Sequence, residues 1–347
     1  MRLVSFSRGG DPERHLGALD GERVLDLGAA AAAVAPGIDP GGRLRSLDAL
    51  IQDWEQGIPL ARTVFERAAD AGGGARAEGG ARAEGGAMQG GGGQAGTREP
   101  GASLAAAWHA RSKVTLHPPV SRPGSFRDFY AFEAHVRAAR ARRGLPVPPE
   151  WYEFPAFYFS NPGAMVGDGA AIRKPAWTEA LDYELEIACV IGVRARDVPA
   201  ERWRSVIAGF TILNDWSARD VQRREMAIGL GPAKGKDFAM SLGPALVTLD
   251  ELEAKRQGDG YDLAMEARVN GATLSRGNVK DLHYTFGQMI ARASQDVYLF
   301  PGDVIGSGTV GTGCLLELGP EVHPWLKPGD EVALEIERLG TLTNTVV

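Results

Sequence analysis

The sequence predicts an α+β protein that is rich in β-strands. Its 347 residues are enough for about two domains. Most segments are short apolar runs that end at glycine, proline or aspartate, which is typical of strands joined by turns. Only a few segments carry apolar residues at helical spacing. The sequence shows no regular alternation of strands and helices and no GxGxxG after an expected strand, which disfavours a dinucleotide-binding fold.

Composition narrows the class of function. Apolar residues make up 44% and charged residues 24%, as in soluble globular proteins. A net charge of −6 disfavours nucleic acid or an anionic membrane as the main partner. No apolar stretch is long enough to span a bilayer, and the first residues lack the apolar core of a signal peptide. Cys189 and Cys314 form no CxxC pair, so we expect a reduced, cytoplasmic setting.

Residues 1–71 are expected to form a small β-rich domain, because strand-like and helix-like patterns alternate there with turns. Its expected elements are a strand at 2–6, a turn at 19–22, a strand at 22–28, a helix at 46–54 with Ser46 as N-cap, and a helix at 59–71.

Residues 72–100 differ in kind from the rest of the chain. They contain two copies of GGARAE followed by glycine-rich sequence, and nothing there can bury a core. Two copies are too few for a β-solenoid. We therefore expect a flexible surface insertion.

Residues 101–347 are expected to form the large domain, which is β-rich with a few helices. Its expected elements are an extended segment at 126–130, a helix at 131–144 that Gly144 ends, a stiff loop at 145–150, strands at 180–192 and 206–215, a helix at 217–226, a hairpin at 263–277 with Asn270-Gly271 at its tip, and a helix at 284–294.

The segment ALDYELEIACVIG, residues 180–192, alternates apolar and acidic residues like a half-buried strand. Asp182, Glu184 and Glu186 fall on one face, where like charges repel each other. A divalent cation with oxygen ligands would explain Glu184 and Glu186 together. Taken alone, the segment is more typical of a solvated outer face, and for Asp182 we expect a strand-edge charge near water.

Two further acids occur in comparable settings. Asp128 lies in RDFY, and Asp215 ends the apolar run VIAGFTILND just before an expected helix. For Asp215 a helix N-cap is an alternative. Four carboxylates would suit Mg²⁺, Mn²⁺ or Ca²⁺ better than zinc, which prefers nitrogen and sulfur ligands.

A histidine could act as a general base near these acids. His135 lies seven residues after Asp128 on an expected helix, beside a cluster of arginines. A lone histidine is often structural, and an arginine run is often a solvated helix face. Glu317 alternates with two leucines on an expected strand and could orient His135, as the acids of catalytic triads do.

Three polar residues could bind a substrate or an oxyanion. Gln222 follows Asp215 by two helical turns, and Lys236 lies in the glycine-rich loop GPAKGKDF. Such a lysine can reach an oxyanion or belong to a solvated turn. Thr309, among the glycines of GSGTVGTG, could help backbone N–H groups to hold a carboxylate.

Taken together, DYELEIACVIG, NDWSARDVQ and FPGDVIGSGT resemble motifs of the fumarylacetoacetate hydrolase superfamily, over about residues 117–345. The first 71 residues are similar to the N-terminal domain of its longer members. The resemblance implies a mixed β-sandwich roll as the catalytic domain, and a homodimer.

The resemblance also implies a role for each candidate residue. The implied roles are metal ligation by Asp128, Glu184, Glu186 and Asp215; a general base, His135, oriented by Glu317; stabilisation of an oxyanion or carbanion by Lys236 and Gln222; substrate contact by Tyr130, Tyr158 and Thr309; and pairing with a substrate carboxylate by Arg143 or, as second choice, Arg142. Mg²⁺ is the first choice of metal, with Mn²⁺ or Ca²⁺ as alternatives.

Some positions depart from the family pattern. Met226 stands where the hydrolase has a substrate-contacting tyrosine, Ala239-Met240 replaces a glycine-threonine pair, and Val310 replaces a proline. The metal site and the His–Glu pair therefore match the family more closely than the substrate pocket does.

We thus expect a metal-dependent hydrolase that cleaves a C–C bond in a small anionic β-diketo acid, such as an acylpyruvate or a fumarylacetoacetate-like compound. The alternative is a decarboxylase, isomerase or hydratase that acts on a 2-oxo acid through an enolate. A non-catalytic binding protein is disfavoured because the implied ligands and base are all present. Residues 133–150 are expected to form a lid over the substrate.

Overall fold

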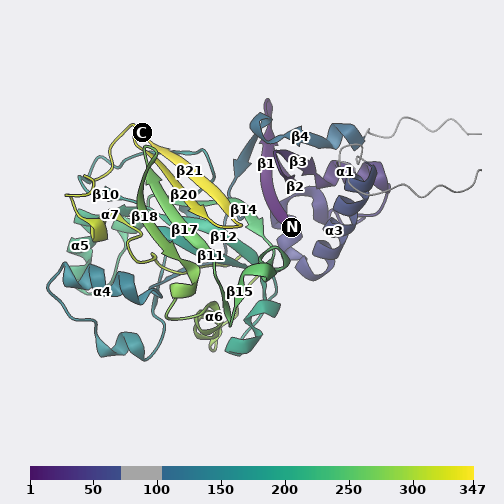
Figure 1. Ribbon diagram of the computed structural model, residues 1–347. Helices are drawn as coiled ribbons and strands as arrows, with labels where there is room; N and C mark the ends of the chain where they lie inside the picture. Colours follow the sequence, from purple (N-terminus) through teal and green to yellow (C-terminus); the bar gives the residue numbers. More distant parts are fainter. Residues whose placement is uncertain (72–103) are drawn as a thin grey trace, which may run out of the picture.

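The computed structural model describes residues 1–71 and 104–347 and confirms a β-rich α+β fold. The insertion expected at 72–100 lies outside the described residues. Figure 1 shows two packed groups of strands in the larger part of the molecule, with the N-terminal segment alongside. Within the described ranges, no helix is both long enough and apolar enough to cross a membrane.

The central sheet contains twelve strands of the described chain, and its main path runs β4-β3-β2-β1-β14-β12-β11-β19-β6-β7, with β5 beside β1 and β8 beside β14. In chain order these strands are β1 (Arg2–Arg8), β2 (Asp11–Asp20), β3 (Arg23–Asp26), β4 (Trp108–Ala110), β5 (Val114–His117), β6 (Phe126–Phe129), β7 (Phe157–Phe159), β8 (Met165–Val166), β11 (Leu185–Ile191), β12 (Ile207–Asp215), β14 (Met240–Val247) and β19 (Val304–Gly306).

A five-stranded sheet in the order β18-β17-β20-β21-β9 packs over β11, β12 and β14, and the described residues add two short two-stranded pairs, β10 with β13 and β15 with β16 (Figure 1). These strands are β9 (Ala171–Ile172), β10 (Leu181–Asp182), β13 (Ser217–Ala218), β15 (Arg256–Gln257), β16 (Gly260–Tyr261), β17 (Ala264–Val269), β18 (Ala272–Asn278), β20 (Glu331–Ile336) and β21 (Gly340–Val346). The apolar side chains between the two sheets form the main core.

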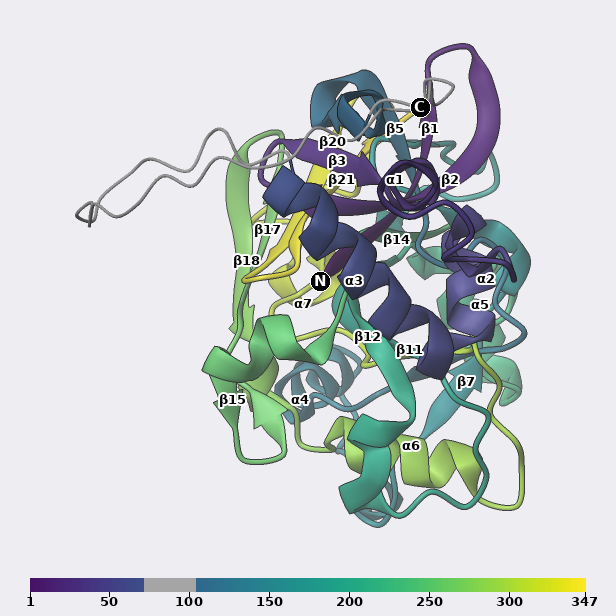
Figure 2. The same cartoon turned by 90° about the vertical axis from the view of Figure 1, so that its right-hand side faces the viewer.

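Helices cover the outer faces and ends of the sheets. They are α1 (Leu27–Val34), α2 (Leu47–Gln52), α3 (Trp54–Ala71), α4 (Glu133–Ala141), α5 (Arg219–Ile228), α6 (Phe286–Ser294) and α7 (Leu315–Leu318). Figure 2 shows α3 running across the face of the central sheet. Its buried residues Ala61, Val64 and Ala68 belong to a second apolar cluster together with side chains of β1 and β14.

The N-terminal segment continues the central sheet. Strand β1 pairs with β2 and β5 and also with β14, where Leu3 lies opposite Leu246. The sequence missed β2, because Pro12 and its charged neighbours obscure the alternation; the turn expected at 19–22 joins β2 to β3, not β1 to β3.

The structure confirms Ser46 as the N-cap of α2, where it accepts a hydrogen bond from the Ala49 N–H. A capping box of Thr285 and Gln288, which the sequence analysis did not predict, begins α6. Asn270 and Gly271 both adopt positive φ at the tip of the β17–β18 hairpin.

The prediction of one half-buried strand at residues 180–192 is wrong. The segment forms two strands, β10 and β11, and every residue of both is buried. Its acids therefore cannot rely on bulk water to screen their charges, and they need partners within the protein.

Candidate active site

Four buried carboxylates converge at one end of the central sheet. Asp128 lies on β6, Glu184 just before β11, Glu186 on β11 and Asp215 at the end of β12. One oxygen from each lies within 4.8 Å of the others. The sequence grouping of these acids therefore corresponds to a real cluster, and the helix N-cap alternative for Asp215 is wrong because α5 begins four residues later.

Glycines at the end of β19 and just after it allow the carboxylates to approach the backbone. Gly306 pairs with Asp128, and a Cβ there would come within 2.4 Å of the Asp128 Oδ1. The Gly308 N–H donates to Asp128 Oδ1 at 3.2 Å and to Glu186 Oε2 at 3.0 Å, with φ at +77°. These two glycines make room for the cluster and partly satisfy it.

The electrostatics of the cluster favour an added cation. Burial, followed by the charges of the neighbouring acids, raises the pKa of Asp128 and the pKa of Glu186 well above their ordinary values. Burial also raises the pKa of Asp215. Burial acts to raise the pKa of Glu184 too, but the Lys236 and Arg219 charges outweigh it and lower that pKa. The negative charge that the four carboxyl groups can carry is therefore larger than the positive charge of Lys236 and Arg219 beside them.

Lys236 lies between two of the carboxylates. Its Nζ donates to Glu184 Oε2 at 2.5 Å and to Asp215 Oδ2 at 2.6 Å, and their charges raise its pKa against the effect of burial. The Tyr158 hydroxyl donates to the same Asp215 oxygen at 2.5 Å. The other oxygen, Asp215 Oδ1, is buried and has no hydrogen-bond partner among the described residues.

These features fit a divalent cation. The donors are all carboxylate oxygens, which hard cations such as Mg²⁺ and Mn²⁺ prefer. The unpaired Asp215 oxygen and the raised pKa of Asp128 and of Glu186 both fit carboxylates that ligate a cation.

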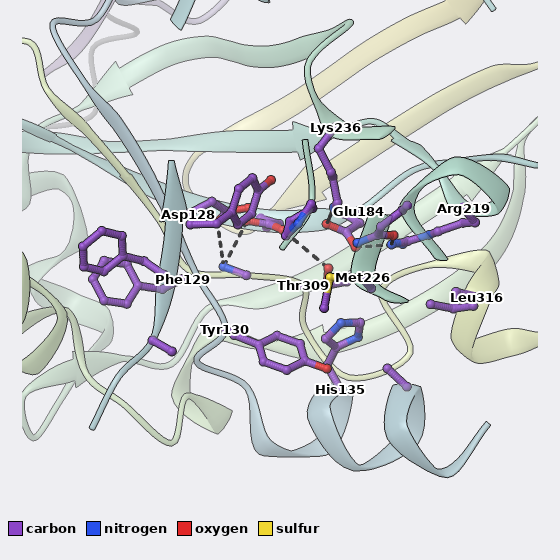
Figure 3. A pocket seen from close by; sticks show the side chains of 18 of the residues that line it. Asp128, Phe129, Tyr130, His135, Glu184, Arg219, Met226, Lys236, Thr309 and Leu316 are labelled. Atoms are coloured by element: carbon purple, nitrogen blue, oxygen red, sulfur yellow. Dashed lines mark hydrogen bonds and ion pairs between the residues drawn. The ribbon is translucent and has the colours of Figure 1, made fainter. Parts of the chain in front are cut away.

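A histidine–glutamate pair faces this cluster across a cavity of about 290 Å³. Figure 3 shows His135 and Tyr130 on one side and Asp128, Glu184 and Lys236 on the opposite side. His135, on α4, is buried, and its Nδ1 lies 2.5 Å from Glu317 Oε1.

Two groups that lie close to Glu317 in the chain hold its carboxylate in place. Its other oxygen accepts the Thr312 N–H at 2.9 Å, and the Cys314 thiol lies 3.7 Å from Oε1. Glu317 lies on α7, so the strand expected around it is wrong. Of the two leucines that flank it, Leu316 lines the cavity and Leu318 is partly buried against the core.

The remaining predicted residues occupy different positions around the cavity. Tyr130, Arg143 and Thr309 line it, whereas Arg142 does not. The Thr309 hydroxyl is directed to Glu186 Oε1 at 3.4 Å. Burial raises the pKa of Tyr130 to about 12, while the Arg143 charge acts in the opposite direction. Arg142 donates to the Glu317 carbonyl oxygen at 2.8 Å and to Glu321 instead.

Gln222 and Met226 project from α5 into the cavity lining. The Gln222 side-chain oxygen accepts a hydrogen bond from Arg219 Nη1 at 3.0 Å. Met226 thus places an apolar side chain, 41% exposed, at the cavity wall.

Sequence reasoning missed Arg219 and misjudged Asp182. Arg219 is buried and donates to Asp182 Oδ2 and Glu184 Oε1, both at 2.7 Å. Asp182, expected to be a strand-edge charge near water, is fully buried. The available signal was the arginine of NDWSARD, which lies four residues after Asp215 and begins α5.

Comparison with known proteins agrees with this geometry. Residues 125–347 match the family model described as fumarylacetoacetate (FAA) hydrolase C-terminal. The chain belongs to the fumarylacetoacetate hydrolase family. Oxaloacetate tautomerase FAHD2A, mitochondrial, from Homo sapiens is 35% identical over 239 residues, which cover 68% of this chain and 71% of that protein.

Similar solved structures extend the comparison. The 2-hydroxyhepta-2,4-diene-1,7-dioate isomerase from Mycobacterium marinum is 29% identical with a TM-score of 0.54, covering 69% of this chain and 80% of its own. Maleylpyruvate hydrolase from Sphingobium sp. SYK-6, in complex with manganese (II) ion and pyruvate, has a TM-score of 0.66 at 23% identity, covering 100% of this chain and 99% of its own. This last likeness concerns the fold, including its N-terminal part.

Proposed function

We propose that the protein is a divalent-metal-dependent enzyme that hydrolyses a C–C bond in a small β-diketo acid. The observation that carries the proposal is the buried His135–Glu317 pair across one cavity from four clustered carboxylates. Names of relatives in the family include a hydrolase, an isomerase and tautomerases, which supports an enzyme without selecting the reaction.

In this proposal Asp128, Glu184, Glu186 and Asp215 hold the metal, Mg²⁺ or Mn²⁺. When bound, such a cation acts as a Lewis acid that polarises substrate oxygens. The manganese in the maleylpyruvate hydrolase structure supports a divalent ion as the cofactor.

His135 is the proposed general base. With its Nδ1 proton directed to Glu317, its Nε2 is the nitrogen free to accept a proton. Glu317 fixes that orientation and stabilises the imidazolium that forms. The two side chains are only 6% and 4% exposed, which restricts rotation of the ring.

Hydrolysis then proceeds in two stages, addition of water and cleavage of the C–C bond. His135 takes a proton from water as the water oxygen bonds to a substrate carbonyl carbon, and Lys236 and Gln222 stabilise the resulting oxyanion. Collapse of the tetrahedral species breaks the C–C bond, and the imidazolium returns its proton to the departing carbon. The products are a carboxylic acid and a 2-oxo acid.

The substrate is expected to be a small anion. A cavity of about 290 Å³ is at the lower end for ligand pockets. Arg143 lines it and is the proposed partner of a substrate carboxylate; Arg142 is engaged with the end of α7. Tyr130 and Tyr158 are proposed as substrate contacts, and the protonated Tyr130 hydroxyl is available as a donor.

A second candidate is keto–enol tautomerisation of a 2-oxo dicarboxylic acid. Here His135 would move a proton between the carbon beside the carbonyl and the enol oxygen, with no water consumed. The small cavity and the 35% identity to the human protein named oxaloacetate tautomerase favour this candidate. Isomerisation, decarboxylation and hydration of a 2-oxo acid would also pass through an enolate, as this tautomerisation does.

Product analysis distinguishes the candidates. The purified protein, supplied with Mg²⁺ or Mn²⁺, is incubated with a series of acylpyruvates and with freshly dissolved enol oxaloacetate. Hydrolysis releases pyruvate and a second acid from the acylpyruvate, whereas tautomerisation only accelerates the decay of enol absorbance. Failure to process any member of either series with either metal would refute the proposal.

We further propose a cytoplasmic homodimer with a small domain at 1–71 and a catalytic domain at 101–347. The two cysteines are unpaired and buried, which suits a reducing setting. Light scattering of the purified chain measures the oligomeric state, and a monomer at micromolar concentration would contradict the dimer.

A further inference from the structure

A fully buried aspartate, outside both the carboxylate cluster and the His–Glu pair, contacts the elements that carry each of them. Asp182 lies on β10, opposite Ser217 of β13, and none of its surface is exposed. Burying a carboxylate this completely is costly unless every lone pair is used. Its two oxygens accept three hydrogen bonds, which reach in two directions.

One direction leads to the carboxylate cluster. Arg219 Nε donates to Asp182 Oδ2 at 2.7 Å, and Nη2 of the same guanidinium donates to Glu184 Oε1 at 2.7 Å. Because the guanidinium is planar, the position of Asp182 sets the plane in which Arg219 presents its N–H groups to Glu184.

The other direction leads to the His–Glu pair. The backbone N–H groups of Leu315 and Leu316 donate to Asp182 at 2.7 Å and 3.0 Å. These residues open α7, whose next residue is Glu317. No side-chain cap is formed by Cys314 at the start of this helix, so Asp182 supplies the acceptor that orients it.

We propose that Asp182 is a positioning residue that fixes Glu184 through Arg219 and Glu317 through α7, and thereby ties the metal cluster to the base. This inference rests on the proposed function. It assigns to one side chain the relative placement of two groups that come from segments about 130 residues apart in the chain.

Replacing the carboxylate by an amide tests both directions. In Asp182→Asn the charge that offsets Arg219 is lost, so the guanidinium neutralises Glu184 more fully and competes with a cation. Outer-shell substitutions of this kind weaken metal binding by on the order of 10- to 100-fold. On the other side the start of α7 loses one acceptor, and the His135–Glu317 hydrogen bond is disturbed.

The experiment measures binding and hydrogen bonding rather than turnover. Mg²⁺ and Mn²⁺ affinities come from calorimetry on the full chain. The ¹⁵N shifts of the His135 ring report the hydrogen bond from Nδ1 to Glu317. The matched control is Asp330→Asn, since Asp330 is also buried and accepts the Lys327 N–H at 2.9 Å at a turn outside the cavity lining.

The expected result is weaker metal binding and shifted ring resonances in Asp182→Asn, with neither change in Asp330→Asn. Wild-type affinity together with wild-type ring shifts in a folded Asp182→Asn protein would overturn the inference. If the wild-type chain itself binds neither metal, the proposed function fails, and the ring shifts alone then decide the link to α7.

A measurement on the unmodified chain covers the case in which Asp182→Asn does not fold. Mg²⁺ binding should slow amide exchange at Leu315 and Leu316, on the order of tenfold, because ordering Glu184 also orders Arg219 and Asp182. Unchanged exchange at both amides on saturation with metal would overturn the coupling.

Discussion

Lys236→Met separates the charge-balancing role of this lysine from its proposed catalytic role. The ammonium is 4% exposed and pairs with Glu184 and Asp215, which are also buried. Removing one partner of a buried ion pair usually costs about 3–5 kcal/mol, because the remaining charge is left uncompensated. The metal-free variant should therefore lose about that much unfolding free energy.

Divalent metal should reverse the loss. Without the competing ammonium the cluster is more negative, so Mg²⁺ should bind more tightly, by on the order of tenfold. Metal at 100 times its dissociation constant adds about 2.7 kcal/mol of stability, which recovers most of the deficit. Turnover should nevertheless fall, because the oxyanion loses a donor.

The assay is urea unfolding with chelator and with saturating Mg²⁺, together with calorimetry. The matched control is Lys234→Met, two residues away, where the ammonium is 60% exposed and pairs with Asp237; its effect should stay within about 1 kcal/mol. A Lys236→Met protein as stable as wild type in chelator, or one that binds Mg²⁺ no more tightly, would refute this reasoning.

Three other substitutions test separate parts of the account. Glu317→Gln should lower turnover by roughly 10²- to 10⁴-fold while leaving metal affinity unchanged, since it disturbs only the base; a loss of affinity in calorimetry would contradict this separation. Gly306→Ala should abolish tight metal binding and lower the thermal midpoint, because its Cβ would meet Asp128 Oδ1 at 2.4 Å; normal binding would show that the loop can move aside. Burial acts to raise the pKa of Asp250, but hydrogen bonds from Arg62 and Thr248 outweigh it and lower that pKa, so the carboxylate stabilises the fold above its unfolded pKa of about 4 and loses this effect as pH falls below it. Asp250→Asn should therefore cost up to about 1 kcal/mol at pH 7 and progressively less as the pH falls below about 4, in urea unfolding; a pH-independent difference would argue against this ion pair.

Three of the clustered acids were predictable because they lie at one end of a strongly apolar strand. Glu184 and Glu186 lie at the start of β11 and Asp215 at the end of β12, and these strands are neighbours in the sheet. The family resemblance then supplied roles for Asp128 and His135, which local patterns alone left open.

What the sequence did not reveal depends on contacts between distant segments. The four residues of α7 are too few to show a helical period, so Glu317 was assigned to a strand. Asp182 was judged from its neighbours in the chain, whereas its partners are Arg219 and the start of α7. The pairing of β1 with β14, which joins the N-terminal segment to the central sheet, is likewise invisible to local patterns.

In the proposed reaction, a divalent cation in the carboxylate cluster and the His135 base are both required. The most direct measurement is turnover of acylpyruvates and enol oxaloacetate by chelator-treated protein, before and after Mg²⁺ or Mn²⁺ is restored, alongside His135→Asn. The account predicts no turnover after chelation, recovery with metal, and a His135→Asn protein that binds metal but stays inactive. Full turnover in chelator, or in His135→Asn, would contradict it.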